Sequence, residues 1–269
     1  MARRDSRPTE GIGGEQVEGR QAVRELLRAK RRPVRQILIA DGVGASEGIL
    51  EILDLAEAAR VGVRRVSRDQ IDAAARTDTP QGVVARAGPV TEARLSTLIR
   101  AGEGAPPPFL VVLDGVTDPH NLGAVMRSAL CAGATGLVIA RHRSAQLSPT
   151  AVKAAAGAVE HLPVATVAGI PAALSELSSA GIWTVGLDSG STGSVWDLQV
   201  ATEPIALVLG AEGAGLSRLV RARCELIVGI PMSGPLDSLN VSAAAALACF
   251  EVARRRAGSA ARPISSGPS

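Results

Sequence analysis

Residues 109–140 read FLVVLDGVTDPHNLGAVMRSALCAGATGLVIA, and this stretch decides the fold class. Its first five residues are all apolar, which is typical of a strand buried on both faces of a parallel sheet. A turn follows, in which Asp118 and Pro119 signal a helix start and Asn121 is the expected cap. The helical pattern then gives way to a second apolar run. The order strand, helix, strand predicts two parallel strands joined by a crossover helix.

The same alternation continues toward the C-terminus. Further strands are expected at 162–167, 182–188, 204–210 and 225–231, and helices at 122–132, 151–159, 172–180, 216–222 and 241–254. Strands that alternate with helices predict an α/β fold, in which helices cover both faces of a mostly parallel sheet. We assign this domain to residues 109–256.

A smaller α/β unit precedes it, at 15–88. Helical patterns lie at 21–30, 47–61 and 68–76, and strand patterns at 34–40, 61–67 and 82–88. Three consecutive prolines at 106–108 cannot continue a helix, so residues 89–108 are expected to form a linker. The ends, 1–14 and 257–269, are rich in Gly, Ser, Pro and Arg and are expected to be disordered tails.

Composition excludes several classes of protein. No apolar run approaches the roughly 20 residues of a membrane-spanning helix, and no apolar stretch follows the basic start as in a secretory signal. The chain has three cysteines, without metal-ligand spacing, and its histidines show none either. Buried thiols in a reducing cytoplasm are therefore expected, with no metal and no membrane.

The charge balance bears on nucleic-acid binding. The net charge is +3, but arginines near the two ends supply it, so attraction to RNA must come from local patches or from the tails. Tyrosine is absent and phenylalanine and tryptophan number two each, so few bases could be held by stacking. The densest basic patch of the body, which is either an RNA-binding surface or a solvated helix end, consists of Arg20, Arg24, Lys30, Arg31, Arg32 and Arg35.

Ligands of open parallel sheets bind beyond the carboxyl ends of the strands, where three segments of this chain carry unusual residues. Arg127 interrupts an otherwise apolar helix. Its guanidinium could bind a phosphate, or it could be a solvated side chain on an outer face. Glu212 stands among three glycines, in a ligand loop or an ordinary turn. Ser238 and Asn240 precede an alanine-rich helix, where helix capping is the alternative role for Ser238.

Together the three segments resemble the three motifs of the SpoU (TrmH) family of RNA ribose 2′-O-methyltransferases. The matching residues are Asp118, Pro119, Asn121, Gly123, Arg127 and Ser128, then Gly210, Glu212, Gly213 and Gly215, then Ile230, Pro231, Ser238, Leu239, Asn240 and Val241. Residues 17–87 resemble the small L30e-like domain of longer family members. Residues 113–129 and 143–158 are most similar to the branch that methylates a guanosine of 23S rRNA.

The resemblance implies a SPOUT domain with a trefoil knot, a homodimer, and S-adenosylmethionine as methyl donor. Backbone groups of Gly210, Ile230 and Leu239 would hold the donor. Arg127 would be catalytic, with Asn121, Glu212, Ser238 and Asn240 orienting it and the ribose. Because a guanidinium keeps its proton at neutral pH, we favour an electrostatic role for Arg127 over a role as base.

Three alternatives remain at this point. The chain could be a tRNA guanosine 2′-O-methyltransferase of the same family, although the separate first domain argues against the short form of that enzyme. It could be a non-catalytic RNA-binding relative. A dehydrogenase-like nucleotide-binding domain is disfavoured, because residues 210–215 read GAEGAG and no early GxGxxG fingerprint is present.

Overall fold

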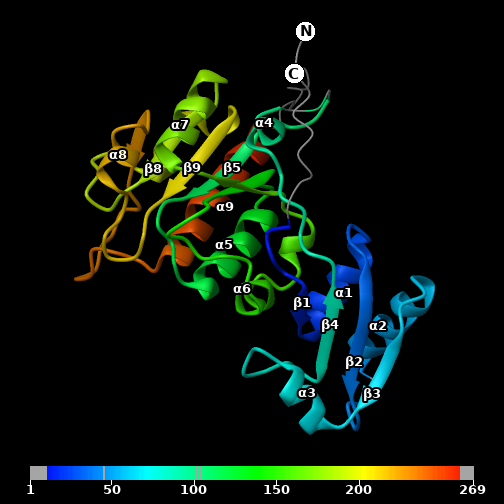
Figure 1. Cartoon of the computed structure of the whole chain (residues 1–269). Coiled ribbons are helices and arrows are strands. Elements are labelled where there is room, and N and C mark those ends of the chain that lie inside the picture. Colours follow the sequence, from blue (N-terminus) through cyan, green and yellow to red (C-terminus); the bar gives the residue numbers. More distant parts are fainter. Residues whose placement is uncertain (1–10, 45, 101, 103, 261–269) are drawn as a thin grey trace, which may run out of the picture.

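The structure is a computed structural model that describes residues 11–44, 46–100, 102 and 104–260. Two α/β domains lie side by side in it (Figure 1). Most of each predicted tail, residues 1–10 and 261–269, lies outside the described residues. Residues 11–14, also assigned to a tail, run beside the predicted linker: Ile12 N donates to Val90 O at 3.0 Å, and Val90 N donates to Gly13 O at 2.8 Å.

The first domain is a four-stranded sheet with helices on both faces. Its strand order is β1-β4-β2-β3, in which β2 and β3 are parallel and β4 is antiparallel to both of its neighbours. Strand β1 was not predicted, because three residues are too few to show an alternating pattern. In chain order the elements are β1 (Gln16–Glu18), α1 (Arg20–Ala29), β2 (Val34–Ala40), α2 (Glu47–Ala58), β3 (Val63–Val66), α3 (Arg68–Ala74) and β4 (Val83–Ala87).

The second domain confirms the predicted parallel sheet, with six strands in the order β10-β8-β9-β5-β6-β7 and every pair parallel. Its elements are α4 (Leu95–Leu98), β5 (Phe109–Leu113), α5 (Pro119–Cys131), β6 (Gly136–Ala140), α6 (Pro149–Ala154), η1 (Ala158–Glu160), β7 (Val164–Val167), α7 (Ile170–Ser179), β8 (Trp183–Leu187), η2 (Val195–Asp197), η3 (Gln199–Thr202), β9 (Ile205–Leu209), α8 (Arg218–Arg221), β10 (Leu226–Val228) and α9 (Val241–Ala260).

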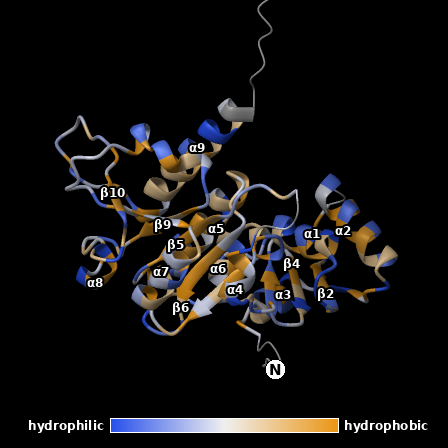
Figure 2. Ribbon diagram, turned by 90° about the horizontal axis from the view of Figure 1, so that it is seen from above, coloured by the Kyte–Doolittle hydropathy of each residue, from blue (hydrophilic) through white to orange (hydrophobic). Residues whose placement is uncertain are grey.

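Helices cover both faces of this sheet. Alternate residues of β5 show the two layers: Phe109, Val111 and Leu113 belong to the core with α5, α6 and α9, and Leu110 and Val112 to the core with α4, α7 and α8. In Figure 2 the strands β5, β6 and β9 form an apolar centre between these helices. The trefoil knot is a matter of chain threading, which strand order alone does not define, and it stays a prediction.

Several helices differ in length from their predictions, and two of these differences bear on the domain junction and on the predicted tail. The helix expected at 151–159 ends at Ala154, and a separate short helix, η1, follows. The break lies at Ala156 and Gly157, which have φ values of 49° and 95° and turn the chain toward the first domain. An added Cβ on Gly157 would come within 2.3 Å of the Glu25 Cβ, so only glycine permits this close approach. Helix α9 runs to Ala260, into the segment predicted as a tail.

A buried ion pair joins the two domains beyond this turn. Arg32 donates from Nε to Glu160 Oε2 at 2.9 Å and from Nη2 to Glu160 Oε1 at 2.5 Å. The two side chains are only 4% and 2% exposed. Arg32 Nη1 also donates to the carbonyl oxygens of Gly14 and Gly88, at 2.6 Å each. Its place in the predicted RNA-binding patch was therefore wrong, because burial between the domains removes it from any RNA.

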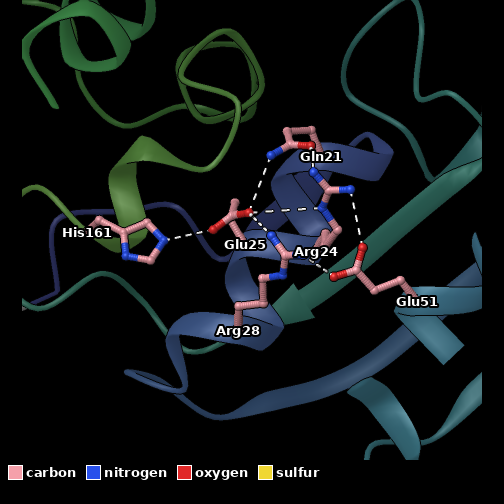
Figure 3. Close-up of polar contacts among 6 residues, drawn as sticks. All are labelled: Gln21, Arg24, Glu25, Arg28, Glu51 and His161. Atoms are coloured by element: carbon pink, nitrogen blue, oxygen red, sulfur yellow. Dashed lines mark hydrogen bonds and ion pairs between the residues drawn. The ribbon is translucent and has the colours of Figure 1, made fainter. Parts of the chain in front are cut away.

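A second polar network lies beside the pair (Figure 3). His161 Nε2 lies 2.9 Å from Glu25 Oε2 across the domain junction, and Arg28 Nη1 donates to Glu25 Oε1 at 3.0 Å. Arg24 Nη1 donates to Glu51 Oε2 at 3.2 Å. Arg24, also part of the predicted patch, is thus engaged with a carboxylate of its own domain.

Removing one partner of the buried pair should destabilise the protein strongly. We expect Arg32→Met to lower the free energy of unfolding by about 3–5 kcal/mol, because Glu160 would remain charged and buried without a partner. Denaturant titration measures this. The matched control is Arg31→Met, at an exposed neighbouring position, which should change stability by about 0.5 kcal/mol or less. The double variant Arg32→Met/Glu160→Leu should recover part of the loss, because the carbonyl oxygens of Gly14 and Gly88 still lose their donor; equal losses in both arginine variants would contradict the assignment.

The Glu25 network should make stability depend on pH. Burial raises the pKa of Glu25, but hydrogen bonds from His161 and Arg28 outweigh it and hold that pKa below its ordinary value. The contribution is therefore complete above the unfolded pKa of about 4.3 and is lost as pH falls through the lower folded pKa. Glu25→Gln should destabilise the protein at pH 7, and its difference from wild type should shrink steadily below about pH 4. Denaturation curves at pH 7 and below about pH 4 test this. If the difference in unfolding free energy between Glu25→Gln and wild type were the same at both, the prediction would be wrong.

Candidate functional site

A cavity of about 300 Å³ opens beyond the carboxyl ends of β8, β9 and β10. This is the edge where ligands of open parallel sheets bind. The cavity is lined by the segments that follow the three strands and by the start of α9. Five of the predicted site residues line it, namely Gly210, Glu212, Ile230, Ser238 and Leu239.

The loop after β9 forms one wall of the cavity. Ala211 and Gly215 exchange two backbone hydrogen bonds, at 3.0 and 2.9 Å, which close residues 211–215 into a tight turn. Gly210 packs against the far side of this turn, where an added Cβ would lie 2.0 Å from the Gly215 carbonyl carbon. Glycine is therefore required at position 210 by space, and Glu212 is left exposed at the tip.

A polar bridge joins the three segments that the sequence singled out. Asn240 Nδ2 donates to Asn121 Oδ1 at 3.0 Å and to Glu212 Oε1 at 2.5 Å. Asn121 is buried in the first turn of α5, and Glu212 faces the cavity. Positions 121, 212 and 240, far apart along the chain, therefore meet at one point.

The helix caps differ from the predictions. Asp118 caps α5, because its side chain accepts from His120 N at 3.0 Å and Pro119 occupies the first helical position. The prediction that Asn121 caps this helix was therefore wrong. At α9 the cap is Asn240, whose Oδ1 accepts from Ser242 N at 2.8 Å and from Ser242 Oγ at 2.6 Å. Ser238 instead lines the cavity.

Arg127 lies elsewhere. It is exposed on α5 and lines a second cavity, of about 790 Å³, between the two domains. Within the part of the chain that the structure describes, its side chain forms no hydrogen bond or ion pair. The structure thus brings seven of the eight predicted residues to the first cavity or its polar bridge, and places the eighth in the cleft between the domains.

Sequence reasoning missed the contribution of β8 to the first cavity. Leu187, Asp188 and Ser189 follow that strand and line the cavity. Asp188 also forms an ion pair with Arg221 of α8. The signal was present, since the apolar run at 182–188 ends in an aspartate at the same sheet edge.

The thiols are only partly buried as expected. Burial raises the pKa of Cys249 to about 12, and burial together with the nearby Asp114 raises that of Cys224 to about 12. Such thiols are poor nucleophiles and poor metal ligands at neutral pH. Cys131 is exposed, against expectation. Among the described residues, no group of three or more His, Cys, Asp and Glu side chains could hold a metal ion, and no helix is long and apolar enough to cross a membrane.

Comparison with known proteins covers both domains. Residues 108–250 match the model of the SpoU rRNA methylase family, and residues 16–93 match that of the RNA 2′-O ribose methyltransferase substrate-binding domain. The 23S rRNA (guanosine-2′-O-)-methyltransferase RlmB of Pseudomonas putida is 39% identical, over 90% of this chain and 97% of its own length. A putative TrmH family tRNA/rRNA methyltransferase of Bacillus subtilis, YacO, is 37% identical, over 89% and 95%.

Solved structures share the arrangement. The SpoU methyltransferase AviRb from Streptomyces viridochromogenes, in complex with the cofactor AdoMet, superposes with a TM-score of 0.74 at 26% identity, covering 91% of this chain and 95% of its own. An RNA 2′-O ribose methyltransferase superposes with a TM-score of 0.75 at 27% identity, covering 90% and 88%. A structure described for 2-OH methylation of C/U34 on tRNA covers 58% of this chain and 99% of its own, at 28% identity and a TM-score of 0.51.

The packing of Gly210 yields a testable prediction. Gly210→Ala should lower the free energy of unfolding by about 1–3 kcal/mol, because the new Cβ cannot fit against the Gly215 backbone without displacing the loop. Gly234→Ala, in the neighbouring loop, is the control, since nothing lies within 4 Å of its added Cβ. Denaturant titration compares the two variants. If Gly210→Ala had the unfolding free energy of the wild type, the loop would be able to shift and accommodate the new Cβ.

Proposed function

We propose that this chain, which belongs to the SpoU rRNA methylase family, methylates a ribose 2′-hydroxyl of RNA with S-adenosylmethionine as donor, and that its target is a guanosine of 23S rRNA. The observation that carries the proposal is the bridge from Asn240 to Asn121 and Glu212. It joins the three family segments at the mouth of a cavity of ligand size, at the edge of the sheet where ligands bind.

The first cavity fits the methyl donor. Its glycine-rich wall exposes backbone groups that can hydrogen-bond an adenosyl moiety, and Gly210 leaves no side chain in the way. Ile230, Leu239 and Val241 add apolar side chains to a lining that also holds the carboxylates of Asp188, Glu212 and Asp237. When bound, S-adenosylmethionine supplies the methyl group from a positively charged sulfonium.

The polar residues would position the acceptor. The ribose hydroxyl must lose its proton as it attacks, so its alignment and charge must both be controlled. Glu212, Asn240 and Ser238 stand at the cavity and would orient the ribose, with Asn121 holding Asn240 in place. Arg127 opens into the cleft between the domains, which supports a role in holding the RNA phosphate; its role in stabilising the developing alkoxide is carried over from the family motif.

We favour rRNA over tRNA as the substrate, because the similarity to an rRNA methyltransferase extends over more of this chain. RlmB of Pseudomonas putida covers nine-tenths of this chain, whereas the tRNA-modifying structure covers little more than half. The first domain, which matches a substrate-binding model, would supply RNA recognition. An enzyme with this substrate would work in the cytoplasm.

We propose further that the active form is a homodimer. Helix α9 carries Ala243, Leu247 and Phe250 on one exposed stripe, at the i, i+4 and i+7 spacing of a single helix face. Leu247 is 41% exposed and Phe250 50% exposed, which is unusual for such large apolar side chains. A second copy packed against this stripe would cover them.

The proposed activity is tested with the full chain, S-adenosylmethionine and 23S rRNA. We expect one added methyl group on a guanosine ribose, located by mass spectrometry of nuclease digests. Asn240→Asp keeps the oxygen that caps α9 but loses the donors to Asn121 and Glu212, so kcat should fall about 100-fold with little change in stability. Arg127→Lys should retain more activity than Arg127→Ala, because it keeps the charge.

Two results would count against this proposal. Wild-type rates in Asn240→Asp would show that the polar bridge has no part in the reaction. Wild-type rates in both Arg127 variants would remove Arg127 from any catalytic role.

A further inference from the structure

The cleft between the domains has walls from both of them. The first domain contributes the loop that follows α3, residues 76–81, and the second contributes α5 and α6. Arg127 of α5 and Lys153 of α6 face this space, together with Arg76 of the loop. Arg76 also lines two further hollows, one on the first domain and one that Leu147 and Pro149 of the second domain help to line, so the loop borders all three depressions.

The three cations of the cleft have no direct carboxylate partner among the described residues. Among the described residues, the side chains of Arg76 and Arg127 form no hydrogen bond or ion pair. Lys153 Nζ donates to Thr77 Oγ1 at 3.2 Å and to the Thr79 hydroxyl; it contacts no carboxylate directly there, although the Thr77 hydroxyl in turn donates to Glu18. Hydroxyl groups hydrogen-bond the ammonium group without neutralising its charge, which an anionic oxygen would do.

Negative charge at the cleft is largely withdrawn from solvent. Glu18 is fully buried, and its carboxylate accepts from Arg76 N at 2.7 Å, from Thr77 N at 3.2 Å and from Gln16 Nε2 at 2.6 Å. It therefore fixes the start of the 76–81 loop instead of repelling an anion. Asp78 is the other acidic residue of the lining, against the three cations Arg76, Arg127 and Lys153.

We propose that Arg76 and Lys153 bind phosphates of the RNA strand that is methylated, and that the cleft is the path of this strand from the first domain to Arg127. The inference rests on the proposed function and adds two substrate-positioning residues to it. A phosphate would take the place of the threonine hydroxyls at Lys153. Phosphate contacts suit this chain, since its few aromatic residues leave little scope for base stacking.

Salt dependence of RNA binding tests the proposal on the full-length protein. The probe is a 23S rRNA fragment that the wild type methylates, and its affinity is measured over a series of salt concentrations. Lys153→Ala and Arg76→Ala should each weaken binding several-fold, and each should reduce the slope of log affinity against log salt by about 0.7–0.9, as for one lost phosphate contact.

The matched control removes the same charge elsewhere. Arg100→Ala changes an exposed arginine just after α4. Helix α4 lies far from the first domain in Figure 1, and Arg100 lines none of these cavities. It should leave affinity and slope unchanged. Affinity for S-adenosylmethionine, measured by calorimetry, should stay at the wild-type value in all three variants, and Lys153→Arg should restore the slope lost in Lys153→Ala.

The outcomes separate this inference from the function on which it rests. A wild-type protein that methylates no RNA would defeat the proposed function. A wild type that methylates RNA, with variants of Lys153 and Arg76 that match Arg100→Ala in affinity and slope, would defeat the cleft proposal alone.

Discussion

The buried ion pair between Arg32 and Glu160 holds the two domains in one arrangement. Two charges removed from water are tolerated only when each satisfies the other, and here the remaining donors of the guanidinium meet two backbone carbonyls. Glu160 reaches Arg32 because the chain turns at Ala156 and Gly157. The width of the cleft, and so the spacing of Arg76 from Arg127 and Lys153, follows from a contact that involves none of these three residues.

The sequence was informative where the physics is local. Strands buried on both faces must be apolar throughout, so runs such as 109–113 and 205–209 revealed the parallel sheet directly. The strand order could not be predicted, because β9 pairs with β5 and β8 through contacts far apart along the chain. The burial of Arg32 was hidden for the same reason: its partner lies 128 residues away, and a basic cluster looks alike whether solvated or paired.

The site shows the same division. Three segments could be nominated because each follows a strand, and all strands of a parallel sheet end at one edge. Their meeting at the amide of Asn240 depends on side-chain geometry, which spacing does not encode. Arg127 lies only six positions after Asn121 on one helix, yet it opens into a different cavity, because two turns of α5 separate the sheet edge from the domain junction.

Asn240 uses every polar atom of its side chain. The oxygen begins α9 through Ser242, and the nitrogen reaches Asn121 and Glu212. Aspartate offers the oxygen without the donors, serine and threonine are too short to span both partners, and glutamine moves its amide one bond further out. The start of a 20-residue helix and the reactive end of the molecule therefore share one side chain. In evolutionary terms this is a pleiotropic position, where neither trait can drift independently of the other.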